Sequence, residues 1–386
     1  MNVQLTDEQR AVREGVARVC ARFDDAYWLA RDRDGQFPHD FCKALIDAGW
    51  FGATMPVEYG GSGLGMREAA LIMHEIGKLG AAAATSVHIN IFGPHPVVRF
   101  GSESLKRRTL PRLVSGEDRP CFGVTEPDAG LNTTDIKTFA RRKGDRYVID
   151  GRKVWTSTAQ HANKILLITR TTPKADCARP TDGMTLFYTD LDRSRIEVRE
   201  IEKMGRKAAD SNQIFIDGLE VPEEDRIGEE GKGFSYLLHG INPERIIVTA
   251  GFNGATRAVL DKAVRYAGER VVFGRPIGQN QAIQHPLADI WARLTAAELL
   301  TWQAATLYDT DQPCGAECNA AKYLGGEIYF DAATRAVRTH GGFGYAKEYH
   351  VERYFREAVL PLIAPISQEL VLCYIAEKVL GLPKSY

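Results

Sequence analysis

The chain has 386 residues, of which 44% are hydrophobic, and its formal net charge at pH 7 is -1. This length predicts two or three packed units rather than one simple core. The nearly balanced charge argues against nucleic acid or an anionic membrane as the main partner, because both select proteins with an excess of basic residues.

The seven cysteines are scattered, and only Cys314 and Cys318 are close to each other in the sequence. No histidine pair with zinc-like spacing accompanies them, so we expect reduced, buried thiols and no metal site. An amphipathic helix pattern begins almost at Met1, without a signal peptide, transit peptide or long apolar span before it. These features predict a cytoplasmic protein without membrane insertion.

The first third of the chain is predicted to be helical. Thr6 and Gln9 have the spacing of a capping box. Val12, Val16 and Val19 then recur on one helical face, and further helical stretches continue to about residue 118. We therefore expect an N-terminal α-helical domain over residues 1–118.

From Pro120 onward, short β-branched and aromatic runs alternate with turns such as Asp150–Gly151 and Asp217–Gly218. This pattern predicts an antiparallel sheet or small barrel, assigned to a middle domain at 119–226.

After Gly231 the helical period returns, which predicts a C-terminal helical bundle over residues 227–386. Asn242–Pro243 looks like a helix start, with Asn242 as N-cap and proline in the first helical position.

Two segments carry the strongest functional signal. Residues 122–132 read Phe-Gly-Val-Thr-Glu-Pro-Asp-Ala-Gly-Leu-Asn, and residues 153–158 read Lys-Val-Trp-Thr-Ser-Thr. Each alone could be a turn or a core tryptophan in an ordinary sheet. Together, in this order, they resemble the flavin-binding middle domain of the acyl-CoA dehydrogenase family. A flat, apolar ring system needs an aromatic wall and a few fixed polar partners, which such segments supply.

Three later segments match the same family, so the resemblance covers essentially the whole chain. They are Glu269–Gly274 with Asn280–Gln281, then His340–Tyr345, then Glu348–Ala358. The resemblance implies an α+β multidomain fold with a helical N-terminal domain, a middle antiparallel β-barrel or sheet, and a C-terminal four-helix bundle. It also implies an FAD cofactor, an acyl-CoA substrate, an electron-transferring flavoprotein as electron acceptor, and a homotetramer built as a dimer of dimers.

The resemblance further implies which residues bind FAD, and the set that includes Arg270 reaches the FAD of another subunit. The implied FAD-binding residues are Phe122, Val124, Thr125, Gly130, Leu131, Trp155, Thr156, Ser157, Arg270, Phe273, Asn280, Gln281, Arg338, Gly341, Gly342 and Ser367.

The catalytic base is expected at Glu244. The family commonly carries its glutamate in a late Tyr-Glu-Gly-Thr element, which corresponds here to residues 364–367 and contains no glutamate. A branch that includes isovaleryl-CoA dehydrogenase carries it on the first long helix of the C-terminal domain, directly before an arginine, as in Glu244–Arg245. The alternative is an ordinary acidic residue in a first helical turn, stabilised by the helix dipole.

The implied substrate contacts are Leu131, Asn242, Arg245 and Ile366. In the family, a backbone N–H at the terminal glutamate position polarises the thioester carbonyl, but Pro365 has no N–H. Either Ile366 donates after a shift of one residue, or one donor is absent.

The leading hypothesis is α,β-dehydrogenation of an acyl-CoA, an oxidoreductase reaction on a CH–CH group, with Glu244 abstracting the α-proton and hydride passing to flavin N5. A flavin monooxygenase or oxidase on the same fold is a second hypothesis, which Glu244 disfavours and Pro365 favours. A non-catalytic flavoprotein scaffold is a third. We expect a branched or medium-length acyl chain.

Overall fold

A computed structural model describes residues 4–93 and 95–385, and its first part is helical as expected. The N-terminal helices are α1 (Asp7–Cys20), α2 (Asp25–Asp34), α3 (His39–Asp47), α4 (Met66–Gly77), α5 (Ala81–Phe92), α6 (His95–Phe100) and α7 (Glu103–Val114). The predicted capping box is confirmed, because the Gln9 N–H donates to Thr6 Oγ1 over 3.2 Å and the Thr6 N–H donates to Gln9 Oε1 over 3.1 Å.

The middle part is one sheet with the strand order β6-β7-β3-β2-β4-β5-β8, and β1 pairs with β4. Its strands are β1 (Pro120–Gly123), β2 (Phe139–Lys143), β3 (Arg146–Ser157), β4 (Lys164–Arg170), β5 (Met184–Asp190), β6 (Ile196–Glu200), β7 (Ser211–Pro222) and β8 (Arg226–Ile227). Most pairs are antiparallel as expected, but β1 and β2 run parallel to β4. The sheet is therefore mixed, because β4 follows these strands through long connections rather than a tight hairpin turn.

The C-terminal part is helical as expected. Its elements are α8 (Gly233–Glu269), the hairpin β9 (Val271–Val272) and β10 (Arg275–Pro276), and the helices α9 (Gln281–Asp309), α10 (Gly315–His340), α11 (Val351–Ala358) and α12 (Gln368–Tyr374). One apolar core joins α8, α9, α10 and α11, so four helices form the bundle, although α11 has only 8 residues. The exact domain boundaries after residues 118 and 226 stay predictions.

The predicted helix start at Asn242–Pro243 is wrong. Helix α8 begins at Gly233 and continues through Pro243. Proline in a helix interior removes one hydrogen bond and costs about 3 kcal/mol. Packing outweighs this cost, because the first turn of α8 lies so close to the sheet that a Cβ on Gly233 would be 2.5 Å from the backbone nitrogen of Leu186.

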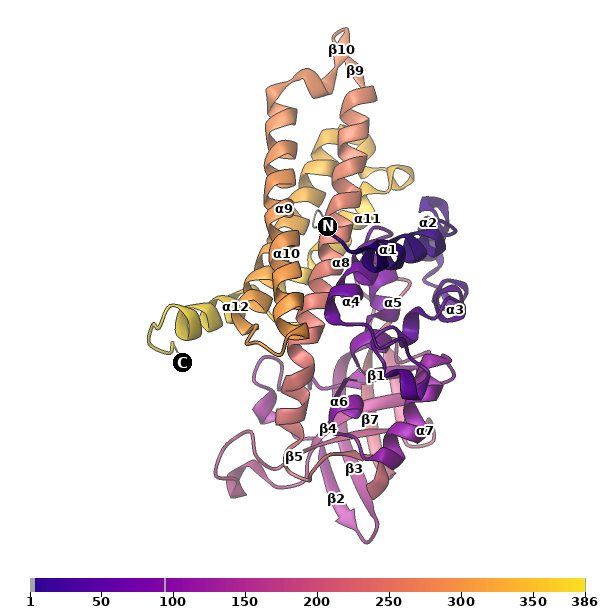
Figure 1. Cartoon of the computed structure of the whole chain (residues 1–386), viewed down its shortest axis with the longest axis vertical. Coiled ribbons are helices and arrows are strands. Elements are labelled where there is room, and N and C mark those ends of the chain that lie inside the picture. Colours follow the sequence, from indigo (N-terminus) through magenta and orange to yellow (C-terminus); the bar gives the residue numbers. More distant parts are fainter. Residues whose placement is uncertain (1–3, 94, 386) are drawn as a thin grey trace.

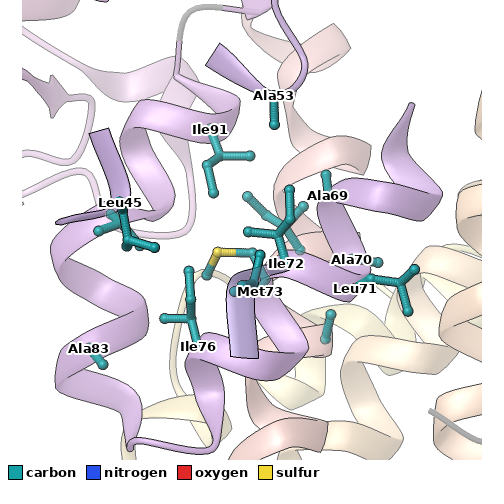
Figure 2. Close-up of a cluster of buried hydrophobic side chains, with 14 of the residues drawn as sticks. Leu45, Ala53, Ala69, Ala70, Leu71, Ile72, Met73, Ile76, Ala83 and Ile91 are labelled. Atoms are coloured by element: carbon teal, nitrogen blue, oxygen red, sulfur yellow. The ribbon is translucent and has the colours of Figure 1, made fainter. Parts of the chain in front are cut away.

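Helix α8 connects all three parts of the molecule (Figure 1). A core of buried side chains joins the N-terminal helices to it, and Figure 2 shows α4 residues such as Leu71, Ile72 and Met73 in this cluster. Glycines bring α4 and α8 into direct contact. A Cβ on Gly77 would lie 2.2 Å from the Gly251 carbonyl oxygen, and one on Gly254 would lie 2.0 Å from that of His74. No helix of the described residues is long and apolar enough to cross a membrane.

The α4–α8 contact predicts opposite effects for two alanine substitutions in α8. We expect Gly254→Ala to lower the free energy of unfolding by about 1–3 kcal/mol, since the new methyl group overpacks the helix crossing. The control Gly268→Ala, where a Cβ meets nothing within 4 Å, should raise it by about 0.5–1 kcal/mol through helix propensity. Denaturant unfolding measures both, and equal effects would contradict the close contact.

Candidate active site

The two motif segments of the middle domain are held together by direct hydrogen bonds. The Val154 N–H donates to the Thr125 carbonyl over 2.9 Å. The Lys153 side chain, which is fully buried, donates to the Val124 carbonyl over 3.0 Å and to Glu126 Oε1 over 2.9 Å. The turn that begins at Thr125 is therefore fixed to strand β3 just before Trp155.

The buried Lys153–Glu126 pair was not among the predicted site residues. Glu126 also accepts the backbone N–H groups of Lys137 over 2.6 Å and of Thr138 over 3.0 Å. Burial raises the pKa of Glu126, but Lys153 and these donors outweigh burial, so its pKa is lowered. Burial lowers the pKa of Lys153 to about 8, against the attraction of Glu126. The sequence did offer a signal for this pair, because the two motif segments contain residues of opposite charge, Glu126 in the first and Lys153 in the second.

Trp155 is not a core residue. Its side chain is 59% exposed, and its backbone is left-handed with a φ of 60°. A register irregularity between Lys153 and Thr156 in the β3–β7 pairing turns the indole ring outward. A left-handed backbone at a non-glycine residue costs about 1–3 kcal/mol and is concentrated at functional sites. The exposed ring therefore excludes the interpretation of an ordinary core tryptophan.

The surroundings of Trp155 fit a flavin. Thr156 is buried, and its Oγ1 has no hydrogen-bond partner within residues 4–93 and 95–385. On the 125–131 turn, Gly130 is exposed with open space at its Cβ position, and Leu131 is 61% exposed. Phe122, Val124, Thr125 and Ser157 are half-buried. An apolar wall, an open glycine and an unpaired hydroxyl are what an isoalloxazine ring with its phosphates requires.

Most of the other predicted FAD residues belong to the β9–β10 hairpin at the far end of the helical bundle (Figure 1), to the segment after it, or to the end of α10. The group comprises Arg270, Phe273, Asn280, Gln281, Arg338, Gly341 and Gly342. Phe273 is fully exposed in the β9–β10 hairpin, and the guanidinium of Arg270 lies 5.8 Å from the ring centre of Phe343. Glu244 lies on α8 and Arg270 directly follows the end of this helix, and at 1.5 Å per residue their spacing is about 39 Å. One chain therefore does not bring both groups to the same place.

Glu244 lies well inside α8, so an N-terminal dipole does not account for it, since that effect fades within the first turn. The side chain is half-buried. Burial raises the pKa of Glu244 to about 7, and the neighbouring Arg245 opposes this rise. A carboxylate with this pKa suits proton abstraction near neutral pH.

The predicted substrate contacts near Glu244 are linked through α10. Asn242 Nδ2 lies 3.6 Å from the sulfur of Cys314, at the start of that helix. Lys322 is buried, and its ammonium donates to the Ile366 carbonyl. Burial lowers the pKa of Lys322 to about 8, and the charge of Arg245 lowers it further.

Two features of this region bear on ligand binding. Arg245 Nε is buried without a hydrogen-bond partner in the described part of the chain. Ser367, predicted to bind FAD, is buried, and its Oγ accepts the Leu370 N–H over 3.3 Å as the N-cap of α12. The chain thus offers one unpaired cationic donor beside Glu244.

The buried Lys153–Glu126 pair predicts a loss of both stability and cofactor. Lys153→Met leaves the Glu126 carboxylate buried and uncompensated, which should lower the free energy of unfolding by about 3–5 kcal/mol. The purified protein should also keep less flavin per chain, since the Thr125 turn loses its anchor.

The matched control is Lys137→Met, because Lys137 contacts Glu126 only through its backbone and its side chain is exposed, and its effect should stay within about 0.5 kcal/mol. Denaturant unfolding and the ratio of flavin to protein absorbance are measured for both variants. A Lys153→Met protein with normal stability and normal flavin content would contradict the role of the pair.

Comparisons with known proteins agree along the whole chain. Acyl-CoA dehydrogenase family models match as the N-terminal domain at residues 6–117, the middle domain at 121–219 and the C-terminal domain at 231–379. The chain is 35% identical to acyl-CoA dehydrogenase FadE12 of Mycobacterium tuberculosis, over 99% of this chain and 98% of the relative. It is 32% identical to glutaryl-CoA dehydrogenase of Desulfococcus multivorans, over 100% and 98% respectively.

Among solved structures, butyryl-CoA dehydrogenase from Megasphaera elsdenii superposes with a TM-score of 0.93 and 28% identity, covering 98% of this chain and 100% of that one. The fold, the motif order and these relatives agree. The chain belongs to the acyl-CoA dehydrogenase family, whose members are FAD-dependent oxidoreductases.

Proposed function

We propose that this enzyme introduces a double bond between Cα and Cβ of an acyl-CoA thioester, with Glu244 as the base. The observation that carries the proposal is a half-buried carboxylate with a pKa of about 7 on α8, in a chain whose 364–367 element contains no carboxylate. Glu244 takes the α-proton of the substrate. FAD, when bound, supplies the acceptor for the β-hydride.

The residues around Glu244 support substrate binding. Arg245 supplies a donor that has no partner in the described residues, which suits an anionic CoA ester. Asn242 precedes it on α8 and is assigned to the pantetheine part of the substrate. Because Pro365 has no N–H, the thioester carbonyl is assigned to the backbone N–H of Ile366, whose own carbonyl is anchored by Lys322. Leu131 is assigned to both cofactor and substrate.

A second copy of the chain completes the flavin site in this proposal. Arg270 follows the end of α8, about 39 Å along the helix from Glu244, so we assign Arg270 to the FAD of another subunit. An exposed phenylalanine at a hairpin tip, Phe273, also suits burial against a partner. We assign a homotetramer built as a dimer of dimers, a cytoplasmic location, and an electron-transferring flavoprotein as the electron acceptor.

An oxidase or monooxygenase reaction on the same fold is the second candidate. The missing N–H at Pro365 favours it, since a weaker hold on a thioester carbonyl would suit another substrate. The half-buried Glu244 with a raised pKa disfavours it, because a reaction with O₂ on the flavin needs no such base.

Glu244→Gln separates these functions. A panel of branched and medium-chain acyl-CoAs, added anaerobically to the FAD-loaded protein, should bleach the flavin absorbance. In Glu244→Gln the rate should fall roughly 10²–10⁴-fold, as expected for loss of a general base. The control Glu202→Gln changes an exposed glutamate and should react normally.

Three results would each decide against part of the proposal. Equal bleaching rates in Glu244→Gln and wild type would remove Glu244 as the base. Bleaching by no acyl-CoA, together with rapid reaction of reduced flavin with O₂ and hydroxylation of a substrate, would favour the second candidate. Failure to reconstitute the protein with FAD would contradict both enzyme functions and leave a non-catalytic role as the remaining hypothesis.

The raised pKa of Glu244 predicts a pH profile. Only the ionised carboxylate accepts a proton, so kcat/KM should rise with pH through about 7 and level off above it. Initial rates measured between about pH 5.5 and about pH 8.5 give this profile. A rising limb centred near the ordinary glutamate pKa, or one that persists in Glu244→Gln, would assign the titration to another group.

A further inference from the structure

Helices α5 and α8 pack against each other and run antiparallel. Ala84 of α5 lies 3.6 Å from the Cβ position of Gly251 on α8. Further along the chain, Pro96 of α6 lies 3.9 Å from the Cβ position of Gly240. From Ala84 to Pro96 the chain therefore runs antiparallel to α8, which it meets first at Gly251 and then at Gly240. Glu244 lies between these two levels.

Half-buried residues of both helices lie next to this contact. Within residues 81–91, only Ala84 and His88 are not buried, and they are one helical turn apart. On α8, Glu244 and Val248 are also one turn apart and half-buried, while residues 249–251 are buried. Half-buried positions therefore follow α8 from Glu244 to Val248, and the Ala84–Gly251 contact comes next along the helix.

Arg206 lies beside the Ala84–Gly251 contact. It belongs to the loop between β6 and β7, and its Nη1 donates to Thr85 Oγ1 over 3.0 Å, beside Ala84. Thr85 Oγ1 in turn donates to the Ala81 carbonyl over 2.8 Å. Burial lowers the pKa of His88 to about 4, and the charge of Arg206 lowers it further, which places the guanidinium near that imidazole. His88 is thus neutral at physiological pH, and Arg206 supplies the positive charge.

The guanidinium of Arg206 has no ion-pair partner among the described residues. Its Nε is buried without a hydrogen bond there. Burial lowers the pKa of Arg206, and Glu357 attracts it without forming a salt bridge. Its backbone is left-handed with a φ of 56°, a strained conformation at a non-glycine residue. A largely desolvated cation without an anionic partner is unfavourable, and an anionic ligand would offset this cost.

We propose that Arg206 binds a carboxylate at the far end of the acyl group, so that the preferred substrate is the CoA thioester of a medium-length dicarboxylic acid. This inference rests on the proposed desaturation, with Glu244 at the α-carbon. Gly251 follows Glu244 by seven residues, which is about 10 Å along α8. After allowing about 3 Å for the hydrogen bonds to Arg206, an extended chain with about six bonds from the α-carbon to the distal carboxylate spans the remaining distance.

The test compares two substrates of equal length. The kcat/KM of the FAD-loaded enzyme is measured with the eight-carbon dicarboxylic substrate suberoyl-CoA and with its monocarboxylic counterpart octanoyl-CoA. We expect the wild type to prefer suberoyl-CoA by at least about tenfold, since a site built for a charged group rejects an analogue that lacks it. Arg206→Met should abolish this preference by lowering the suberoyl-CoA value, while the octanoyl-CoA value stays the same or rises.

Two controls separate charge recognition from structural damage. Lys207→Met removes a positive charge from the exposed neighbour in the same loop and should keep the wild-type preference. Arg206→Lys should keep part of it. In the Glu244→Gln background, where turnover is blocked, Arg206→Met should weaken the binding of suberoyl-CoA alone.

The outcomes are distinct. A wild type that uses octanoyl-CoA as well as suberoyl-CoA, or better, would overturn the carboxylate inference and leave the proposed desaturation intact. An equal loss for both substrates in Arg206→Met would assign Arg206 a structural role and also overturn it. Flavin reduction by neither these substrates nor any other acyl-CoA would overturn the proposed function itself. Should Arg206→Met not fold, the wild-type ratio and Arg206→Lys decide the question.

Discussion

The close contact between α4 and α8 is the constraint on which the rest of the structure depends. Glycines at 77 and 254 let the two backbones touch, which fixes α8 against the N-terminal helices. The first turn of α8 is fixed against the sheet at Gly233, and its far half forms the bundle. Because both ends of α8 are packed, the helix tolerates Pro243. Glu244 is thereby fixed between the Gly240–Pro96 and Gly251–Ala84 contacts.

Much of this organisation was predictable from the sequence, because periodicity and ordered motifs are local signals. The change from helix to sheet to helix, the capping box at Thr6 and the position of Glu244 on a long helix needed no tertiary knowledge. The helix start at Asn242 was predicted wrongly, because local preferences do not include the packing that carries α8 through Pro243. The parallel pairing of β1 with β4 also depends on contacts distant in sequence.

The missed residues share one property, since each depends on a partner far away in the chain. Lys153 is significant because Glu126 is buried against it, and Arg206 because it reaches Thr85 on α5. A lysine before a tryptophan and an arginine in a loop look like ordinary surface residues in the sequence. Only the fold shows that the Lys153 side chain and the Nε of Arg206 are buried, where an unpaired charge is unfavourable.

The length of α8 has a consequence for how the cofactor is kept. Under the proposed assembly, the residues for one FAD come from two chains. Cofactor binding and subunit association are therefore thermodynamically coupled, so that each favours the other. Dilution would then release flavin even at constant free FAD, and added FAD would drive association. The heat stability of the enzyme would depend on protein concentration as well as on cofactor supply, and in a cell the amount of chain made would itself regulate how much of it is active.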